Sequence, residues 1–80
     1  MSREEILNKL QDIFFDVFGD ETIKINEQTS AEDIEAWDSL TNISILASVQ
    51  DVFSVSFNMD EIVTMNNVKQ IVDAIMGKIK

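Results

Sequence analysis

The chain has no cysteine, histidine or proline, and it has only two glycines. Without cysteine it can form no disulfide and offers no thiol nucleophile of its own. Without histidine it lacks the commonest metal ligand and the usual general base at neutral pH. Most enzyme mechanisms thereby lose their key residue, so we expect a protein that is not an enzyme. The scarcity of proline and glycine leaves little to interrupt helices internally.

Long apolar runs are also missing. No stretch of about 20 consecutive apolar residues is available to span a bilayer. The segment from Ser2 to Glu5 is polar and acidic, whereas a secretory signal begins with basic residues followed by an apolar stretch. We therefore expect no membrane insertion and a cytoplasmic location.

Basic residues are absent between Lys24 and Lys69. Eight acids occupy the same interval: Glu27, Glu32, Asp33, Glu35, Asp38, Asp51, Asp60 and Glu61. The formal net charge of −9 argues against nucleic acid as a partner, because binding it relies on Lys and Arg. Such a run of acids is typical of a solvated face that keeps a small protein soluble. For the acids just before Ser39, docking to a basic partner surface is an equally good interpretation.

The length of 80 residues predicts a single domain over residues 1–80, and we expect a monomer. A chain of this size buries only about 60% of its unfolded surface, so its stability should be modest. With 45% hydrophobic and 26% charged residues it is too apolar for intrinsic disorder. The composition indicates a small globular fold.

The first helix is clearly marked. Ser2 and Glu5 have the spacing of a capping box, and Gly19 provides a stop. Between them, apolar residues recur on one helical face: Ile6, Leu10, Ile13, Phe14 and Val17. We predict a helix over residues 3–18.

Residues 19–37 lack sustained periodicity and are predicted to form a long loop. Thr29 and Ser30 precede Ala31-Glu32-Asp33, a pattern that favours one short helical turn within the loop. Loops of this length tend to be functional or to span a domain. Here the loop has to return the chain to antiparallel register.

A second long helix is predicted from Ser39 to Phe53. Val55 and Phe57 alternate with polar residues after it, but a single short strand would have no partner in this chain. We therefore predict a loop anchored by Phe57. A short helix over residues 60–65 follows.

Asn67 is a suitable N-cap for the last helix. That helix has apolar residues at Val68, Ile71, Val72, Ile75 and Ile79. The predicted fold class is all-α: a small bundle of three main helices plus one short helix, with a long loop between the first and second helices.

The second predicted helix carries two apolar sets. Ile45, Val49 and Phe53 follow one another at intervals of four, which is the spacing of a core face. Leu40, Ile43 and Ala47 form a second stripe rotated away from the first, with Leu46 between the two. One small bundle cannot bury both sets fully. The second stripe is either ordinary exposed apolar surface or a docking patch.

The segment Trp37-Asp38-Ser39-Leu40 stands where this helix begins. Asp38 is a favoured N-cap, which places Ser39 at the mouth of the helix. A phosphodiester built on the Ser39 hydroxyl would lie near free backbone N–H groups and the positive end of the helix dipole. Trp37 is predicted to fasten the loop to the helix start rather than to recognise a partner.

With these residues, the chain resembles the acyl carrier protein family. The resemblance covers nearly the whole sequence and rests on Asp38-Ser39-Leu40, the long helix ending near Phe53, and Met65-Asn66-Asn67-Val68. It implies that a phosphopantetheinyl transferase moves 4′-phosphopantetheine from coenzyme A onto Ser39. The cofactor would then supply the thiol that the sequence lacks, and acyl or aminoacyl groups would be held as thioesters. Asp38 matches the aspartate that helps to position magnesium in the transferase complex.

The resemblance also implies partners: the transferase, an acyl- or aminoacyl-loading ligase, and downstream acyl-processing enzymes. The residues predicted to meet them are Leu40, Ile43, Ala47, Glu35 and Asp51. Fatty-acid carriers usually follow the serine with several acids, whereas Thr41, Ser44 and Gln50 here are neutral. Because charged rim groups set partner choice, a dedicated set of partners is expected rather than the ordinary fatty-acid enzymes.

Two other classes of function share features with this sequence. A small acidic helical interaction module without a prosthetic group would use Leu40 and Ile43 for binding, and Ser39 would merely begin a helix. A calcium sensor is suggested only by acidity, since no segment has the spaced acidic ligands, central glycine and final glutamate of a calcium loop. The module is kept as the alternative, and the sensor is set aside.

Overall fold

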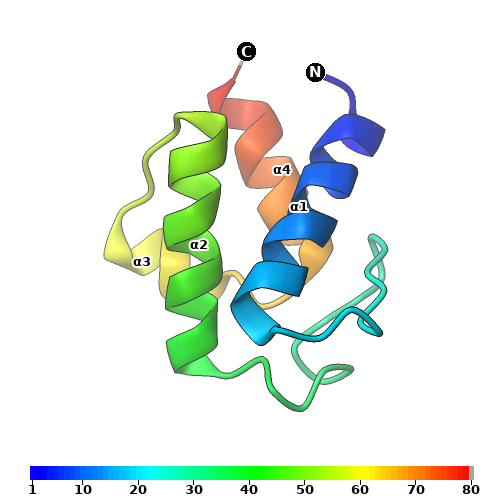
Figure 1. Ribbon diagram of the computed structural model, residues 1–80. Coiled ribbons are helices and arrows are strands. Elements are labelled where there is room, and N and C mark those ends of the chain that lie inside the picture. The colour runs from blue at the N-terminus through cyan, green and yellow to red at the C-terminus, as the bar shows by residue number, and fades with distance from the viewer. Residues whose placement is uncertain (80) are drawn as a thin grey trace.

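The structure is a computed structural model that describes residues 1–79, and Figure 1 shows its four helices. They are α1 (Arg3–Phe18), α2 (Ser39–Phe53), α3 (Met59–Thr64) and α4 (Val68–Lys78). The all-α prediction is confirmed. The two termini lie at one end of the bundle, and α2 begins at the opposite end (Figure 1).

Helix α1 has the predicted capping box. The Ser2 hydroxyl accepts from the Glu5 N–H at 3.2 Å, and the Glu5 carboxylate accepts from the Ser2 N–H at 3.1 Å. The helix ends where Gly19 adopts a left-handed conformation with φ of 63°, which glycine tolerates without steric cost. Both ends therefore follow from local sequence.

The connection between α1 and α2 contains turns but, within the described chain, no helix. The short turn predicted after Ser30 is present as one hydrogen-bonded turn over residues 31–33, but it does not form a helix. The Asp33 carboxylate accepts from the Ser30 N–H at 2.9 Å, and the Asp33 N–H donates to the Ser30 carbonyl at 2.9 Å, which closes a single turn. The Ala31 N–H donates to the Asn66 carbonyl at 2.9 Å, so the chain is tied to the link between α3 and α4 instead of continuing as a helix.

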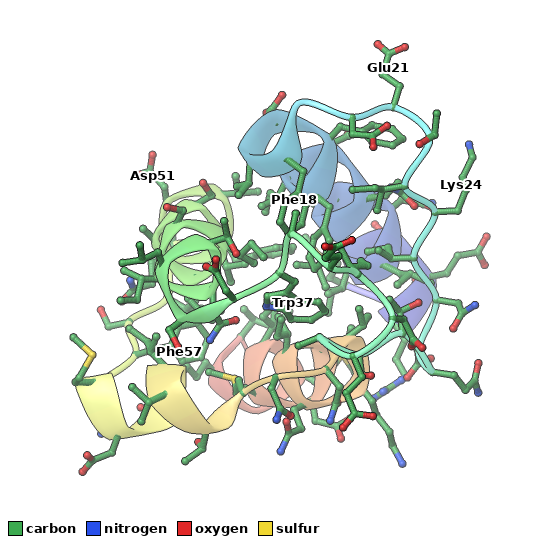
Figure 2. The ribbon with its side chains drawn as sticks, turned by 90° about the horizontal axis from the view of Figure 1, so that it is seen from below. Phe18, Glu21, Lys24, Trp37, Asp51 and Phe57 are labelled. Atoms are coloured by element: carbon green, nitrogen blue, oxygen red, sulfur yellow. The ribbon has the colours of Figure 1, made fainter. Side chains whose placement is uncertain are left out.

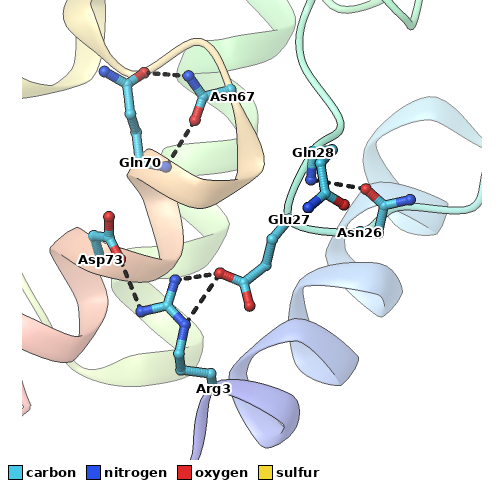
Figure 3. Close-up of polar contacts among 7 residues, drawn as sticks. All are labelled: Arg3, Asn26, Glu27, Gln28, Asn67, Gln70 and Asp73. Carbon is cyan, nitrogen blue, oxygen red and sulfur yellow. Dashed lines mark hydrogen bonds and ion pairs between the residues drawn. The ribbon is translucent and has the colours of Figure 1, made fainter.

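Side chains from the helices hold this loop in place. The Gln11 amide donates to the Ile23 carbonyl at 2.7 Å and accepts from the Ile25 N–H at 2.8 Å. Figure 3 shows the Arg3 guanidinium between the carboxylates of Glu27 and Asp73, with the Asp73 bond at 2.8 Å. The α1 side chains Gln11 and Arg3 thus fix one flank of the loop, and Arg3 also connects it to α4.

Helix α3 spans Met59–Thr64, whereas residues 60–65 were predicted. The earlier start has a local cause: the Asn58 side chain accepts from the Glu61 N–H at 2.8 Å, and the Glu61 carboxylate accepts from the Asn58 N–H at 3.1 Å. This is a capping box that the sequence already contains. Helix α4 begins after Asn67, as predicted.

The segment between α2 and α3 is a loop anchored by Phe57, as predicted. Phe57 is buried, and its N–H donates to the Gln50 side chain at 2.8 Å.

One core of buried residues lies between the helices. The predicted core face of α2 is confirmed, because Ile45, Val49 and Phe53 are all buried. Leu46 is fully buried too, so it belongs to the core rather than between the two faces. The largest side chains that are fully buried in the described chain are Phe14, Ile6, Leu10, Ile45, Leu46, Ile71, Ile75, Val49, Val68 and Val72.

Candidate functional site

The start of α2 is fixed by reciprocal hydrogen bonds between Asp38 and Thr41. Asp38 Oδ1 accepts from the N–H groups of Leu40 and Thr41, each at 3.0 Å. In return, Thr41 Oγ1 accepts from the Asp38 N–H at 2.8 Å and donates to the Ala36 carbonyl at 2.9 Å. The hydrogen bond from the Thr41 N–H is the main cause that lowers the pKa of Asp38 below its ordinary value. Asp38 is therefore a charged N-cap, as predicted.

Ser39 is the first residue of α2, and it is exposed. Its hydroxyl makes no hydrogen bond to any part of residues 1–79, so it is accessible to a modifying enzyme. The expectation of free backbone N–H groups around it needs correction. Asp38 already occupies those of Leu40 and Thr41, so of the first three N–H groups of α2 that of Ser39 is the one without a partner in residues 1–79, beside the positive end of the helix dipole.

The second carboxylate oxygen of Asp38 accepts no hydrogen bond from the described residues. Asp38 as a residue is exposed, and it directly precedes Ser39. Capping uses one oxygen and leaves the other available for an external cation or donor.

Trp37 is buried, with 4% of its surface exposed. Its ring meets Phe14 of α1 edge to face, with centroids 5.1 Å apart. Its indole N–H donates to Asn42 Oδ1 at 3.0 Å, across the first turn of α2. Viewed from the end where α2 begins, Trp37 lies at the centre of the molecule (Figure 2). The predicted fastening of loop to helix is confirmed, and it extends to α1.

Asn42 is a site residue that the sequence reasoning missed. It is buried, with 8% exposed, and its amide donates to the Ile62 carbonyl of α3 at 2.9 Å while its oxygen accepts from Trp37. Loss of either partner would leave a buried polar group unpaired, at a cost of about 1–3 kcal/mol. The available signal was a polar residue one turn before Ile45 and Leu46, on the face that points into the bundle.

A pocket of about 330 Å³ opens beside Ser39. It lies where the start of α2, helix α3, the long loop and the link between α3 and α4 meet. The residues lining it are Ala31, Trp37, Asp38, Ser39, Asn42, Ile43, Ile62, Val63 and Asn66. The pocket walls are therefore partly apolar, and its lining from α2 extends no further than Asn42 and Ile43.

The second apolar stripe of α2 is exposed, as expected for residues that one small bundle cannot cover. Leu40 is 76% exposed and Ile43 42%, and Ala47 is exposed as well. Helix α3 adds Met59 and Val63, at 61% and 64%, which the sequence reasoning did not include.

The two acids predicted to meet partners, Glu35 and Asp51, are also exposed. They do not sit together, since Glu35 precedes α2 and Asp51 lies in its last turn, where its carboxylate points outward (Figure 2).

Two other kinds of site are not found in the described part of the chain. Residues 1–79 hold no group of three or more potential metal ligands. None of the helices found there has both the length and the apolar character needed to cross a membrane.

Comparison with known proteins first defines the class. The family described as the phosphopantetheine attachment site matches residues 8–75, a range that includes the whole of α2 and α3. Its members carry a covalently attached 4′-phosphopantetheine.

Similarity to individual proteins shows which family within this class the chain matches. The chain is 34% identical over 77 residues to an acyl carrier protein from Rubrobacter xylanophilus, covering 95% of this chain and 94% of that protein. A solution structure of holo acyl carrier protein from Geobacter metallireducens is 35% identical with a TM-score of 0.80, covering 90% of this chain and 83% of the other. The chain belongs to the acyl carrier protein family.

A crystal structure of an acyl carrier protein from Thermotoga maritima has the same fold. Its TM-score is 0.85 at 22% identity, covering 98% of this chain and 91% of that one. Three main helices with a short one before the last are thus an arrangement that distant sequences reach.

The residues at the start of α2 fit the family's prosthetic group. They provide an exposed hydroxyl without a hydrogen-bond partner in residues 1–79, a helix N-terminus beside it, and a pocket next to it with partly apolar walls. When bound, 4′-phosphopantetheine supplies a thiol on which acyl groups are held as thioesters.

Proposed function

We propose that Ser39 is the residue to which phosphopantetheine is attached. The observation that carries this proposal is the exposed hydroxyl at the first position of α2, without a hydrogen-bond partner in residues 1–79 and beside the pocket. Of the other serines, Ser2 caps α1 and Ser54 ends α2. None of them combines a capping aspartate with the first position of a long helix.

Intact mass spectrometry tests the assignment. The protein is incubated with coenzyme A and a permissive phosphopantetheinyl transferase, and we expect a gain of one phosphopantetheinyl group. Ser39→Ala should abolish this gain. Ser44→Ala is the matched control, since Ser44 is an exposed serine of the same helix, and it should load normally. Equal loading of Ser39→Ala would refute the assignment.

Asp38 is proposed to have a second role in loading, besides capping α2. Its free carboxylate oxygen stands next to Ser39 and is suited to a magnesium ion brought by the transferase complex. Asp38→Asn keeps a good N-cap but removes the charge, so we expect slower loading with an unchanged helical signal. Asp16→Asn removes an exposed charge in the last turn of α1, outside the proposed partner surface, and should load at the wild-type rate. Equal rates for all three proteins would confine Asp38 to capping.

The exposed stripe of Leu40, Ile43 and Ala47 is proposed as the surface that meets partner enzymes, with Glu35 and Asp51 at its margins. Family membership brings a transferase and biosynthetic enzymes as partners. A loading ligase and a dedicated set of acyl-processing enzymes are our more specific proposal, supported by the neutral Thr41, Ser44 and Gln50.

Within this proposal the chain works as one monomeric carrier domain in the cytoplasm and does no chemistry of its own. It has no cysteine or histidine to supply a nucleophile or a neutral-pH base. The alternative, an interaction module without a prosthetic group, is not favoured by the family match over residues 8–75.

A further inference from the structure

The innermost polar contact of the pocket beside Ser39 is the pair of hydrogen bonds made by Asn42. One joins it to the Trp37 indole at 3.0 Å and the other to the Ile62 carbonyl at 2.9 Å. Trp37, Asn42 and Ile62 all line the pocket. The pocket therefore ends in a polar contact that joins the loop, α2 and α3.

Beyond Asn42 lies the core. Ile45 and Leu46 stand one turn further along α2 on the inward face, and both are fully buried and absent from the pocket lining. A chain that extends from the pocket along the inward face of α2 has to pass the Asn42 side chain. Breaking one of its hydrogen bonds leaves a buried polar group unpaired, which costs roughly 5- to 150-fold in the entry equilibrium.

Burial of the alkyl chain offsets only part of the cost of breaking these hydrogen bonds. Each methylene group that leaves water gains about fourfold in the same equilibrium. Each hydrogen bond broken thus cancels the gain from about one to four methylene groups. A chain that displaces the Asn42 side chain breaks both of its hydrogen bonds, which together cancel the gain from about two to eight methylene groups. This range includes the six methylene groups by which decanoyl exceeds butanoyl, so the wild-type pocket gives little preference to long alkyl chains over short ones.

We propose that Asn42 is a specificity-determining residue that closes the pocket beside Ser39 to long alkyl chains, so that the cargo is a short or polar acyl group. This inference deepens the proposed function and rests on it, because the cargo reaches the pocket only if the arm is attached at Ser39. Asn42 acts through the hydrogen bonds that it makes, and it has no part in the chemistry of loading.

A series of loaded proteins tests the inference. Butanoyl, hexanoyl, octanoyl and decanoyl groups are installed by a permissive transferase from the corresponding acyl-coenzyme A. Two quantities are measured: the rate of thioester cleavage by hydroxylamine, and the indole N–H resonance of Trp37, the single tryptophan. In the wild-type protein we expect cleavage rates within about twofold across the series, and an indole resonance that does not move with chain length.

Asn42→Leu replaces the polar contact with an apolar side chain of similar volume. In this variant, decanoyl should be cleaved at least about tenfold more slowly than butanoyl, because the long chain now enters the bundle. Asn8→Leu is the matched control: it makes the same change at an exposed residue of α1 that does not line the pocket. The control should keep the flat wild-type dependence.

Protection that increases with chain length in the wild-type protein, together with a shift of the Trp37 resonance, would overturn the inference. A flat dependence in a folded Asn42→Leu would overturn it as well. If that variant does not fold, the wild-type series decides alone. Failure to load any acyl group on Ser39 would instead refute the proposed function, so the two failures are distinguishable.

Discussion

The indole N–H of Trp37 donates to Asn42 Oδ1 at 3.0 Å, and this bond links the end of the long loop to the first turn of α2. The acceptor is buried, and the Asn42 amide is already engaged by α3. The start of the helix that carries Ser39 is thus held from inside the bundle as well as by its cap.

Trp37→Phe is expected to lower the free energy of unfolding by about 1–3 kcal/mol, because Asn42 Oδ1 loses its donor inside the core. Urea unfolding measures this loss. The smaller phenylalanine ring also lowers the free energy of unfolding, because it packs less well than tryptophan. A double-mutant cycle with Asn42→Leu separates this packing effect from the loss of the hydrogen bond. The double variant should lose less than the sum of the single variants, and strictly additive losses would show that the bond contributes nothing.

Leu40→Asp is expected to leave the fold intact and to impair turnover by a partner enzyme by about tenfold or more. Leu40 is 76% exposed and lies in the first turn of α2, where an acid is compatible with the helix dipole. Ile43→Asp should act in the same direction, with some loss of stability because Ile43 is only 42% exposed.

Val52→Asp is the control for both changes, because Val52 is a 51% exposed residue of α2 on another side of the helix. It should have normal turnover. Circular dichroism of all three variants checks the fold, and a lost helical signal would assign the substituted residue to the core.

Asp38 predicts a pH dependence of stability. Its pKa in the folded protein lies below the ordinary value of 3.8, so the unfolded chain binds a proton more readily. The stabilisation from this carboxylate is therefore fully present above pH 3.8 and disappears as the pH falls through the lower pKa of the folded state. Comparison with Asp38→Asn separates the stabilisation from the Asp38 carboxylate from the contributions of the other acids. The difference in unfolding free energy between the two proteins should shrink toward acid, and a growing difference would contradict the assignment.

Ser54 adopts a left-handed conformation with φ of 56° at the end of α2, where helices commonly place glycine. Ser54→Gly is expected to raise the free energy of unfolding by roughly 0.5–1 kcal/mol, because relief of backbone strain exceeds the entropy gained by the unfolded chain. Ser56→Gly, in the following loop and outside the left-handed region, should instead lower it by about 0.4–1 kcal/mol. Equal effects of the two changes would show that Ser54 is unstrained.

Much of the fold could be predicted because its signals are local. The Ser2 and Glu5 capping box begins α1, Asp38 begins α2 and Asn67 begins α4, all within a few residues of the groups they satisfy. The start of α3 was misplaced although Asn58 and Glu61 form the same kind of local box. That boundary was available from the sequence.

Other features depend on contacts between distant segments and could not be predicted in this way. The turn at Ser30 and Asp33 looks like a helix start, but the Ala31 N–H is bonded to the Asn66 carbonyl. The position of Asn42 one turn before Ile45 and Leu46 indicates that it faces inward, but only the folded chain shows that Trp37 and Ile62 satisfy its amide. A pattern of polar and apolar residues assigns polar side chains to solvent by default.

The backbone bonds that tie the long loop to the link between α3 and α4 have a consequence for synthesis on the ribosome. The capping bonds of Asp38 join residues within three positions of each other, whereas the pocket wall needs Asn66 to reach Ala31. Closing so long a segment requires most of the chain to be present. In a nascent chain the wall formed by Ala31 and Asn66 would therefore be completed only after α3 has emerged.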